Sequence, residues 1–452
     1  MARETNGQAV TGLDAGFLHL ECESSPMNGL AIVWVDDSDG PRFTHETFTA
    51  LFPELIRRDP IFSARLTTDS HGRRPEWVHG PVALDHHVER VVAPPGAGAD
   101  FVLEVAARVM SRRLSRDRPL WKYTVIEGID GPDGATVALV AVFHHARYDG
   151  LSALRAFATL AGAPAVAPEP VGAPTGPWGR LVRQARGTSG LVRAAWRGAR
   201  RERAGERVPY PPWKTPRLSI SRSLTAAREL AFVDLPVADV SRIRRAFGVT
   251  FNDAFLAIVT GALRTWLGED RPDGPVVTMV PLSVRGDDLA AGNRISAYFA
   301  GLPVHLDDPA ARIHDVAAEM AAVKVRHEDF AAVGLDAFFD TLPWRFLGGR
   351  VRRYCDRDRA DTGRLIANLS ATSVAGSREP LTLLGARVVG IQPFGPIVDG
   401  ITVNVSGLSY GDRLRIGITG APGIGDGVTA LAGAIAEEAD RLLAVVDRTG
   451  SP

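Results

Sequence analysis

An apolar run that passes directly into a pair of histidines is the feature that most restricts the fold of this chain. Residues 136–143 read Thr-Val-Ala-Leu-Val-Ala-Val-Phe, which is typical of a strand buried on both faces. The stretch His-His-Ala-Arg-Tyr-Asp-Gly follows at 144–150, and residues 151–161 carry apolar side chains at helical spacing. The sequence therefore predicts a buried strand, a short turn and a helix, with an imidazole presented where the strand ends.

The rest of the chain alternates strand and helix patterns in two blocks of the same kind. A chain of 452 residues exceeds what one hydrophobic core usually holds, so we expect two α/β domains. Residues 161–177 are rich in Pro, Ala and Gly, which is typical of a linker. The expected units are 1–165, a Pro- and Arg-rich crossover over 166–216, and 217–452. Expected helices are 46–56, 101–114, 151–161, 237–247, 252–266, 310–325 and 428–446, and expected strands are 30–35, 136–143, 276–284, 295–306, 365–374, 386–391, 401–408 and 414–418.

Composition narrows the classes of function. Fifty-two basic residues balance 52 acidic ones, so the net charge gives no argument for a nucleic-acid partner. Only two cysteines occur, which makes a disulfide framework unexpected and a CxxC metal cluster impossible. Residues 1–10 lack the apolar core of a signal peptide, and no apolar run reaches the roughly 18 residues of a membrane span. We therefore expect a soluble, cytoplasmic protein.

The two histidines cannot both face one cleft, because neighbouring side chains of a strand point to opposite faces. One imidazole at the end of the strand would be suited to general-base catalysis. The chain has no Gly-x-Ser-x-Gly motif, so the base would act on a substrate hydroxyl or amine. Two alternatives are a purely structural pair and a metal site at His144, His145 and Asp149, which the opposed faces disfavour. A second pair, His86-His87, lacks a following Asp-Gly and is interpreted as surface or packing histidines.

Short motifs along nearly the whole chain resemble those of one enzyme family. Residues 144–150 are similar to the HHxxxDG motif shared by chloramphenicol acetyltransferase, the condensation domains of non-ribosomal peptide synthesis and carnitine acyltransferases. More specifically, the chain resembles bacterial wax ester synthase/diacylglycerol acyltransferases. The matching stretches, in family order, are 13–18, 26–27, 119–121, 127–128, 249–253, 280–285, 292–296, 378–381, 385–387 and 408–410.

The resemblance implies two chloramphenicol acetyltransferase-like domains, each a mixed sheet with flanking helices, and an active-site tunnel between them. Acyl-CoA would be a co-substrate and an alcohol or other small molecule the acceptor, with no metal or cofactor held permanently. His145 would be the general base, and Asp149 would pair with an arginine to hold the loop. Candidates for that arginine are Arg285 and Arg294. Asn252 would stabilise an oxyanion or orient a substrate, unless it only caps a helix. Further expected site residues are His144, Gly150, Arg147, Tyr148, Ser283 and Ser373.

The chain departs from the family pattern beside the expected base. Residues 373–377 read Ser-Val-Ala-Gly-Ser where the family has Asn-Val-Pro-Gly-Pro, and Arg147 and Tyr148 stand where it has small or aliphatic residues. These two side chains should meet an internal carboxylate or a polar acceptor, unless the arginine is a surface residue and the tyrosine is packed. The acceptor is thus a long alcohol, a diacylglycerol, an amine or a specialised metabolite, and the donor CoA or a carrier protein. A catalytically silent binding protein is disfavoured by the intact motif.

The Arg-rich part of the crossover has two interpretations. Residues 178–207 hold nine arginines against two glutamates, interleaved with apolar residues. Basic amphipathic helices of this kind lie on anionic membranes or lipid droplets. The alternative is a solvated connection between domains, since four glycines at 179, 187, 190 and 198 weaken any helix.

Overall fold

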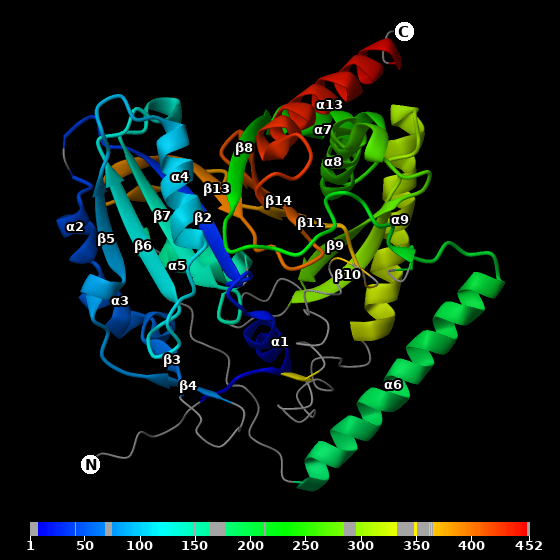
Figure 1. Ribbon diagram of the computed structural model, residues 1–452, viewed down its shortest axis with the longest axis horizontal. Coiled ribbons are helices and arrows are strands. Elements are labelled where there is room, and N and C mark those ends of the chain that lie inside the picture. The colour runs from blue at the N-terminus through cyan, green and yellow to red at the C-terminus, as the bar shows by residue number, and fades with distance from the viewer. Residues whose placement is uncertain are drawn as a thin grey trace.

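The computed structural model describes residues 8–40, 42–67, 75–148, 150–162, 177–211, 214–283, 295–331, 348–349, 361, 363 and 365–449. Within these ranges the strands form two six-stranded sheets and one three-stranded sheet. The two large sheets stand side by side, each with its own helices (Figure 1). The helices are α1 (Gly12–Leu20), α2 (His45–Thr49), α3 (Phe52–Arg58), α4 (Ala99–Met110), α5 (Gly150–Leu160), α6 (Pro177–Arg203), α7 (Val237–Ala246), α8 (Phe251–Leu267), α9 (Pro309–Ala331) and α13 (Gly427–Thr449).

The first large sheet has the strand order β12-β13-β2-β7-β6-β5. Its strands are β2 (Asn28–Asp36), β5 (Val88–Val92), β6 (Trp121–Glu127), β7 (Val137–His144), β12 (Thr382–Leu383) and β13 (Ala386–Phe394). Strand β7 pairs antiparallel with β2 on one side and β6 on the other, and all of its residues except Phe143 are buried. The prediction of a strand buried on both faces is confirmed. Helix α4 packs on one face of this sheet, and aromatic residues of α2, α3 and β6 form the cluster on the other.

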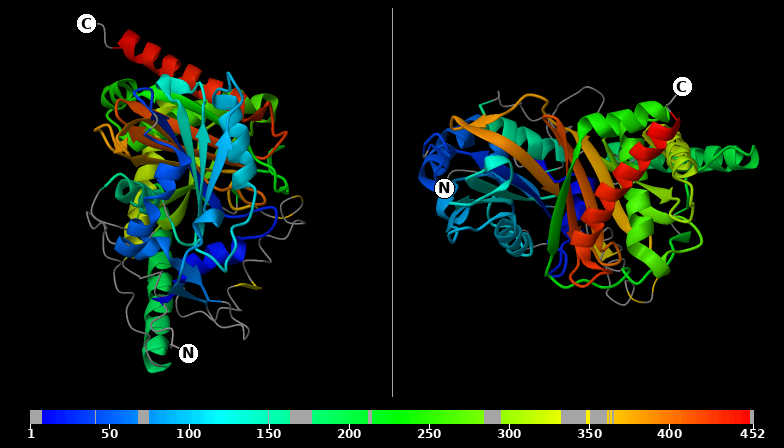
Figure 2. Two further views of the ribbon diagram at one scale, coloured as in Figure 1. Left: turned by 90° about the vertical axis from the view of Figure 1, so that its left-hand side faces the viewer. Right: turned by 90° about the horizontal axis from the view of Figure 1, so that it is seen from above.

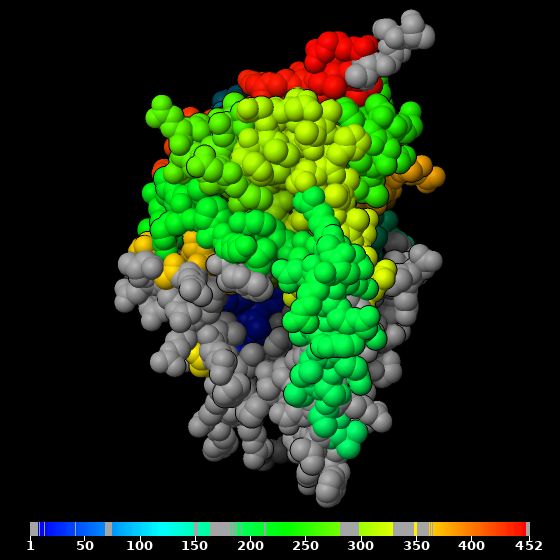
Figure 3. Space-filling view, turned by 90° about the vertical axis from the view of Figure 1, so that its right-hand side faces the viewer, coloured from blue at the N-terminus to red at the C-terminus, as the bar shows by residue number. Residues whose placement is uncertain are grey.

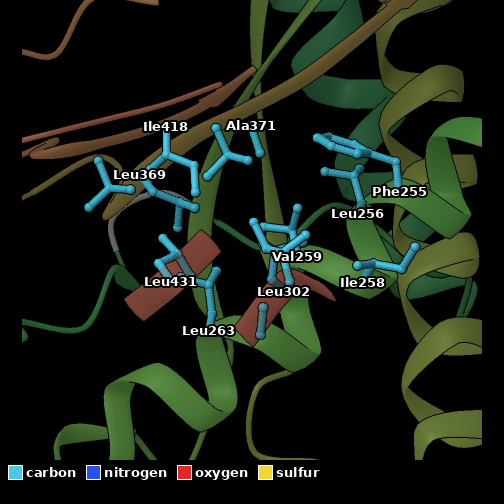
Figure 4. Close-up of a cluster of buried hydrophobic side chains, with 14 of the residues drawn as sticks. Phe255, Leu256, Ile258, Val259, Leu263, Leu302, Leu369, Ala371, Ile418 and Leu431 are labelled. Carbon is cyan, nitrogen blue, oxygen red and sulfur yellow. The ribbon is translucent and has the colours of Figure 1, made fainter. Parts of the chain in front are cut away.

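The second large sheet has the order β10-β9-β11-β14-β15-β8. Its strands are β8 (Glu229–Pro236), β9 (Val276–Ser283), β10 (Ile295–Leu302), β11 (Leu369–Ala375), β14 (Val403–Tyr410) and β15 (Arg413–Gly420). Helix α8 is buried along most of its length and packs between α13, α9 and the sheet. Figure 4 shows Phe255, Val259 and Leu263 of α8 pointing toward Leu302, Leu369 and Ile418 of the strands. The third sheet, β1-β4-β3, is small and consists of β1 (Gln8–Ala9), β3 (Ala64–Leu66) and β4 (Glu76–His79).

Strands β12 and β13 lie within the expected unit 217–452 but belong to the first sheet. There β13 pairs antiparallel with β2 from Arg387 opposite Asp36 to Phe394 opposite Leu30. Figure 2 shows the orange β13 among the blue and cyan strands. The pairing is non-local, so a local strand pattern predicts the existence of β13 but not its partner. Without it, β2 would be an exposed sheet edge.

Three helices also differ from the sequence prediction. The helix expected over 46–56 is two helices, α2 and α3, with Pro53 in the first turn of the second, where its missing N–H is tolerated. Helix α8 begins at Phe251 with Thr250 as its N-cap, and Thr250 and Asp253 form a capping box. Asn252 is therefore not the cap. Helix α6 runs through the expected linker despite its glycines.

Among the helices of the described residues, no single one is long and apolar enough to cross a bilayer. One bent pair, Val237–Ala246 with Phe251–Asp270, would together be long and apolar enough, by length and composition alone, with an angle of 98° at the break.

A polar cluster around Arg415 joins the two large sheets. Arg415 lies in β15 and is buried, and its guanidinium bonds to Asp234 of β8. The same guanidinium donates to Asp133 at 2.8 Å and to the carbonyl of Val389 at 2.8 Å. Val389 belongs to β13 and therefore to the first sheet. Gln392 of β13 donates to Asp234 at 3.2 Å. One buried cation thus links strands from both sheets.

Replacing Arg415 with alanine should lower the stability of the whole protein. The change leaves the mostly buried Asp234 without its cation, so we expect a loss of about 3 kcal/mol or more in the free energy of unfolding. The exposed Arg413 of the same strand is the matched control, and Arg413→Ala should cost no more than about 0.5 kcal/mol. Urea unfolding followed by circular dichroism measures both. Equal midpoints for the two variants would contradict the role given to Arg415.

Candidate active site

The histidine pair lies where β7 turns toward α5. The carbonyl of His144, the last residue of β7, accepts from the backbone N–H groups of Arg147 at 3.0 Å and Tyr148 at 3.1 Å. The N–H of Ala146 donates to Nδ1 of His144 at 3.0 Å. Because Nδ1 is an acceptor here, the neutral imidazole carries its proton on Nε2. The turn itself therefore fixes the tautomer of His144.

His144 is buried beside a carboxylate that sequence reasoning did not identify. Burial lowers the pKa of His144 to about 3, although the nearby Glu21 acts to raise it. Nε2 of His144 lies 3.9 Å from Oε2 of Glu21, whose side chain is fully buried. Arg113 donates to Oε1 of Glu21 at 2.9 Å, and Nε of Arg116 donates to Oε2 at 2.7 Å. His144 is thus a neutral, structural residue beside the buried carboxylate of an ion-pair cluster.

The carboxylate of Glu21 is held in its charged form. Burial alone would raise the pKa of Glu21, but hydrogen bonds and charge from Arg113 and Arg116 outweigh it and lower the pKa. Both arginines follow α4 in the chain. The position of Glu21 just after the Leu13–Leu18 motif was the one available signal, and Glu23, two residues on, shares it.

His145 is held by two contacts and stays partly exposed. Its N–H donates to the carbonyl of Met27 at 2.9 Å, and its ring stacks on Phe17 of α1 with centroids 5.2 Å apart. Nδ1 is buried. Met27 has a φ of 55°, a region that few residues with side chains adopt and that often accompanies functional sites. Phe17 and Met27 belong to the two N-terminal motifs, which therefore both serve to position His145.

A glycine of β2 lies opposite Phe143, the residue before the histidine pair. A Cβ on Gly29 would lie 2.8 Å from Cε2 of Phe143 and 3.6 Å from Cδ2 of His145. The first distance is shorter than van der Waals contact, so the Phe143 ring would have to move, whereas the second is an ordinary contact.

Arg147 and Tyr148 lie on opposite sides of the turn. Tyr148 is buried in the first core, with its ring near Phe143 and its hydroxyl 3.3 Å from the carbonyl oxygen of Ile61. The Arg147 guanidinium lies over the Trp77 ring, 5.0 Å from its centroid. Burial lowers the pKa of Arg147, and the charges of nearby Asp14 and Asp59 act to raise it. The contacts of Tyr148 are those of a packing residue, and its expected role in substrate binding stays a prediction.

Two other expected site residues are brought together in the second half. The hydroxyl of Ser373 in β11 donates to Oδ1 of Asn252 in α8 at 2.9 Å. This hydrogen bond uses the acceptor of the amide and leaves its NH₂ group as a donor. The next residue, Val374, packs against the same cluster of buried residues that contains Tyr148 and Phe143. The end of β11 therefore adjoins the core of the first sheet.

The remaining predicted residues are only partly described. Gly150 is the first residue of α5, and Ser283 is the last of β9, where it pairs with Ile295. Asp149, Arg285 and Arg294 lie outside the described residues. Of the second pair, His87 is buried and its Nδ1 lies 2.8 Å from the carbonyl of Trp121, whereas His86 is exposed. That pair consists of packing and surface histidines, as predicted.

Comparison with known proteins identifies the family. Residues 10–255 match the wax ester synthase/diacylglycerol acyltransferase catalytic domain, and residues 291–442 match the C-terminal domain of the same family. The chain therefore belongs to the wax ester synthase/diacylglycerol acyltransferase family, as its motifs predicted. It is 30% identical over 442 residues to "Putative diacyglycerol O-acyltransferase MT1809" of Mycobacterium tuberculosis (strain CDC 1551 / Oshkosh), covering 92% of this chain and 86% of that protein.

Solved structures confirm the predicted fold. The wax ester synthase/diacylglycerol acyltransferase from Marinobacter aquaeolei VT8 superposes with a TM-score of 0.66 at 20% identity, covering 97% of this chain and all of that one. The first condensation domain of the calcium-dependent antibiotic synthetase gives 0.61 at 16% identity, covering 98% and 97%. The protein is a pair of chloramphenicol acetyltransferase-like domains built on mixed sheets.

Replacing Glu21 with glutamine should destabilise the protein in a pH-dependent way. At neutral pH we expect a loss of about 2 kcal/mol, because two arginines lose a charged acceptor. The pKa of Glu21 is lower in the folded protein than its ordinary value of 4.5. The advantage of the native protein is therefore full above pH 4.5 and is lost as the pH falls through the lowered pKa. Urea unfolding at a series of pH values measures this difference.

The exposed Glu23, two residues away, supplies the control. Glu23→Gln should leave the unfolding free energy within about 0.5 kcal/mol of the native value at each pH. If Glu21→Gln behaved in the same way, the carboxylate would not support the histidine turn.

Proposed function

We propose that this protein transfers an acyl group from acyl-CoA to the hydroxyl of a small acceptor, with His145 as the general base. The observation on which the proposal depends is that the two histidines lie in different environments. His144 is buried, neutral and engaged at Nδ1, with a pKa lowered to about 3, so it is unsuited to proton transfer near neutral pH. His145 is partly exposed and is held by Met27 and Phe17.

The reaction needs no nucleophile from the protein. Nε2 of His145 takes the proton of the acceptor hydroxyl while the oxygen attacks the thioester carbonyl carbon. The tetrahedral intermediate collapses as the carbon–sulfur bond breaks, and the imidazolium returns its proton to the sulfur. The products are an ester and free CoA. Most of the acceleration would come from holding both substrates in line beside one base.

Asn252 is the proposed donor to the oxyanion of the intermediate. Its Oδ1 accepts from Ser373, so the amide is oriented and its NH₂ group is available as a donor. Val374, beside Ser373, packs against the core cluster of the first sheet, which supports a site shared by the two halves. In this proposal the substrates meet between the halves, in a tunnel such as the family resemblance implies.

The acceptor we propose is a lipid alcohol, either a diacylglycerol or a long-chain alcohol. Relatives in Mycobacterium tuberculosis carry the name of diacylglycerol O-acyltransferase, at 30% and 32% identity. The polar hydroxyl of Tyr148 meets the carbonyl of Ile61, so it does not require a polar acceptor to satisfy it. Comparing hexadecanol, a diacylglycerol and a short polar amine as acceptors tests this choice.

Removing the imidazole of His145 should abolish transfer while leaving the fold intact. We expect His145→Ala to reduce turnover by about 10²- to 10⁴-fold, the usual contribution of a general base. Release of the CoA thiol with a long-chain alcohol as acceptor measures the rate. His144→Ala should reduce stability as well as rate, because it opens a cavity beside Glu21.

His86→Ala removes an exposed imidazole and should change neither rate nor stability. A folded His145→Ala protein that kept near-native turnover would exclude His145 as the base. A folded His144→Ala protein as inactive as His145→Ala would mean that the two histidines have been assigned the wrong way round.

Asn252→Ala should lower turnover without moving the apparent acceptor affinity. A single oxyanion donor contributes about 10²- to 10³-fold to turnover. Ser373→Ala, which only frees the amide, should cost less than Asn252→Ala. Steady-state kinetics with a fixed acyl-CoA distinguishes the two. If both variants instead raised the Michaelis constant equally and left turnover unchanged, both residues would bind the substrate in its ground state.

A further inference from the structure

Helix α6 presents apolar side chains to solvent. The described residues contain five exposed large hydrophobic side chains, and three of them belong to this one helix: Val182 (45% exposed), Val192 (65%) and Trp196 (57%). Figures 1 and 3 show α6 extending along the outside of the molecule, clear of both sheets. A concentration of exposed apolar area on one element is a sign of an interaction surface.

These side chains form a stripe along the helix. With 3.6 residues per turn, positions 182, 185, 189, 192 and 196 fall within one face. Exposed Arg193, Arg197 and Arg200 run along one edge of that face, and the Arg200 guanidinium lies over the Trp196 ring at 4.9 Å. The exposed face of α6 is therefore a row of four apolar residues, interrupted by Ser189, with cations beside it.

The opposite side of α6 attaches it to the body. Gly190 and Ala194 are buried, and α6 packs against α9. The Cβ position of Gly198 lies 4.0 Å from Nη1 of Arg326 in α9. Small residues at this spacing let the two helices approach closely, so the glycines serve packing and the stripe stays turned outward. The exposed face is thus a fixed surface of the folded protein.

Helix α6 has a much more positive net charge than the rest of the chain. Residues 177–203 contain eight arginines and one glutamate, whereas the whole chain has equal numbers of basic and acidic residues. A tryptophan surrounded by arginines, such as Trp196, is typical of surfaces that bind at the boundary between lipid headgroups and acyl chains. A second copy of this chain is a poorer partner, because pairing two such faces would bring arginines together.

We propose that the exposed face of α6, defined by Val182, Val192, Trp196, Arg193, Arg197 and Arg200, docks the protein on an anionic lipid surface. The apolar stripe would enter the headgroup region while the arginines contact lipid phosphates. This inference is independent of the acceptor assigned above, since it rests on the outer face of α6 and on no residue of the histidine turn.

Vesicle co-sedimentation of the full-length protein tests the proposal. The probes are vesicles of phosphatidylcholine alone and of phosphatidylcholine mixed with phosphatidylglycerol, at low and high salt. We expect binding to the anionic vesicles, weakened by salt. Reversing Arg193, Arg197 and Arg200 to glutamate should weaken binding at least about 100-fold, since each basic residue contributes about fivefold. Val192→Ser with Trp196→Ser should weaken it at both salt concentrations.

Matched variants elsewhere on the surface serve as controls. Val92→Ser removes an equally exposed valine of β5, and reversal of Arg108, Arg245 and Arg448 changes the same net charge away from α6. Both should bind vesicles nearly as the native protein does. All variants should keep native thiol release with a water-soluble alcohol, which confirms folding.

Three results would overturn the proposal. The first is no binding to anionic vesicles at low salt. The second is binding that the α6 variants and the controls alter equally, which would mean that net charge alone drives it. The third is a concentration-dependent dimer, measured by sedimentation velocity without lipid, that is lost in the Val192 and Trp196 variant, which would assign this face to a second copy of the chain.

Discussion

The opposed directions of two successive side chains at the end of β7 organise the site. Because β7 is buried between β2 and β6, its last residue, His144, points into the protein and must lose its charge. The following residue leaves the sheet and can meet a substrate. Glu21, Phe17 and Met27 then hold the two imidazoles in these separate environments. Because successive side chains point in opposite directions, His144 has a structural role and His145 is the candidate base.

The two halves are joined by contacts of different kinds. Arg415 supplies a buried charge cluster, the Trp34 and Phe232 rings lie 6.1 Å apart, and β13 extends the first sheet. Each involves residues far apart in the chain. The proposed site has His145 on one half and Asn252 on the other. It requires contacts that fix the two halves relative to each other, because a small shift would misplace the oxyanion donor or the base.

The sequence predicted the local elements and the family of this protein better than it predicted contacts between residues far apart in the chain. The buried strand, the turn and the helix around the histidines were evident because each depends on nearby residues. The family followed from motifs spread along the chain. Glu21 was missed because its partners, Arg113 and Arg116, lie some 90 positions away. The membership of β13 in the first sheet and the cap at Thr250 were missed because an apolar pattern specifies an element, not its neighbour or its first residue.

The pairing of β13 with β2 also bears on how the protein is made. During synthesis β2 and β7 emerge early, whereas the strand that covers the open edge of β2 emerges only after most of the second half. Until then the nascent first sheet exposes unpaired backbone groups along an apolar strand, which invites aggregation. The long loop that must close makes this step slow. A truncated chain ending near residue 217 would therefore lack two strands of the first sheet, β12 and β13.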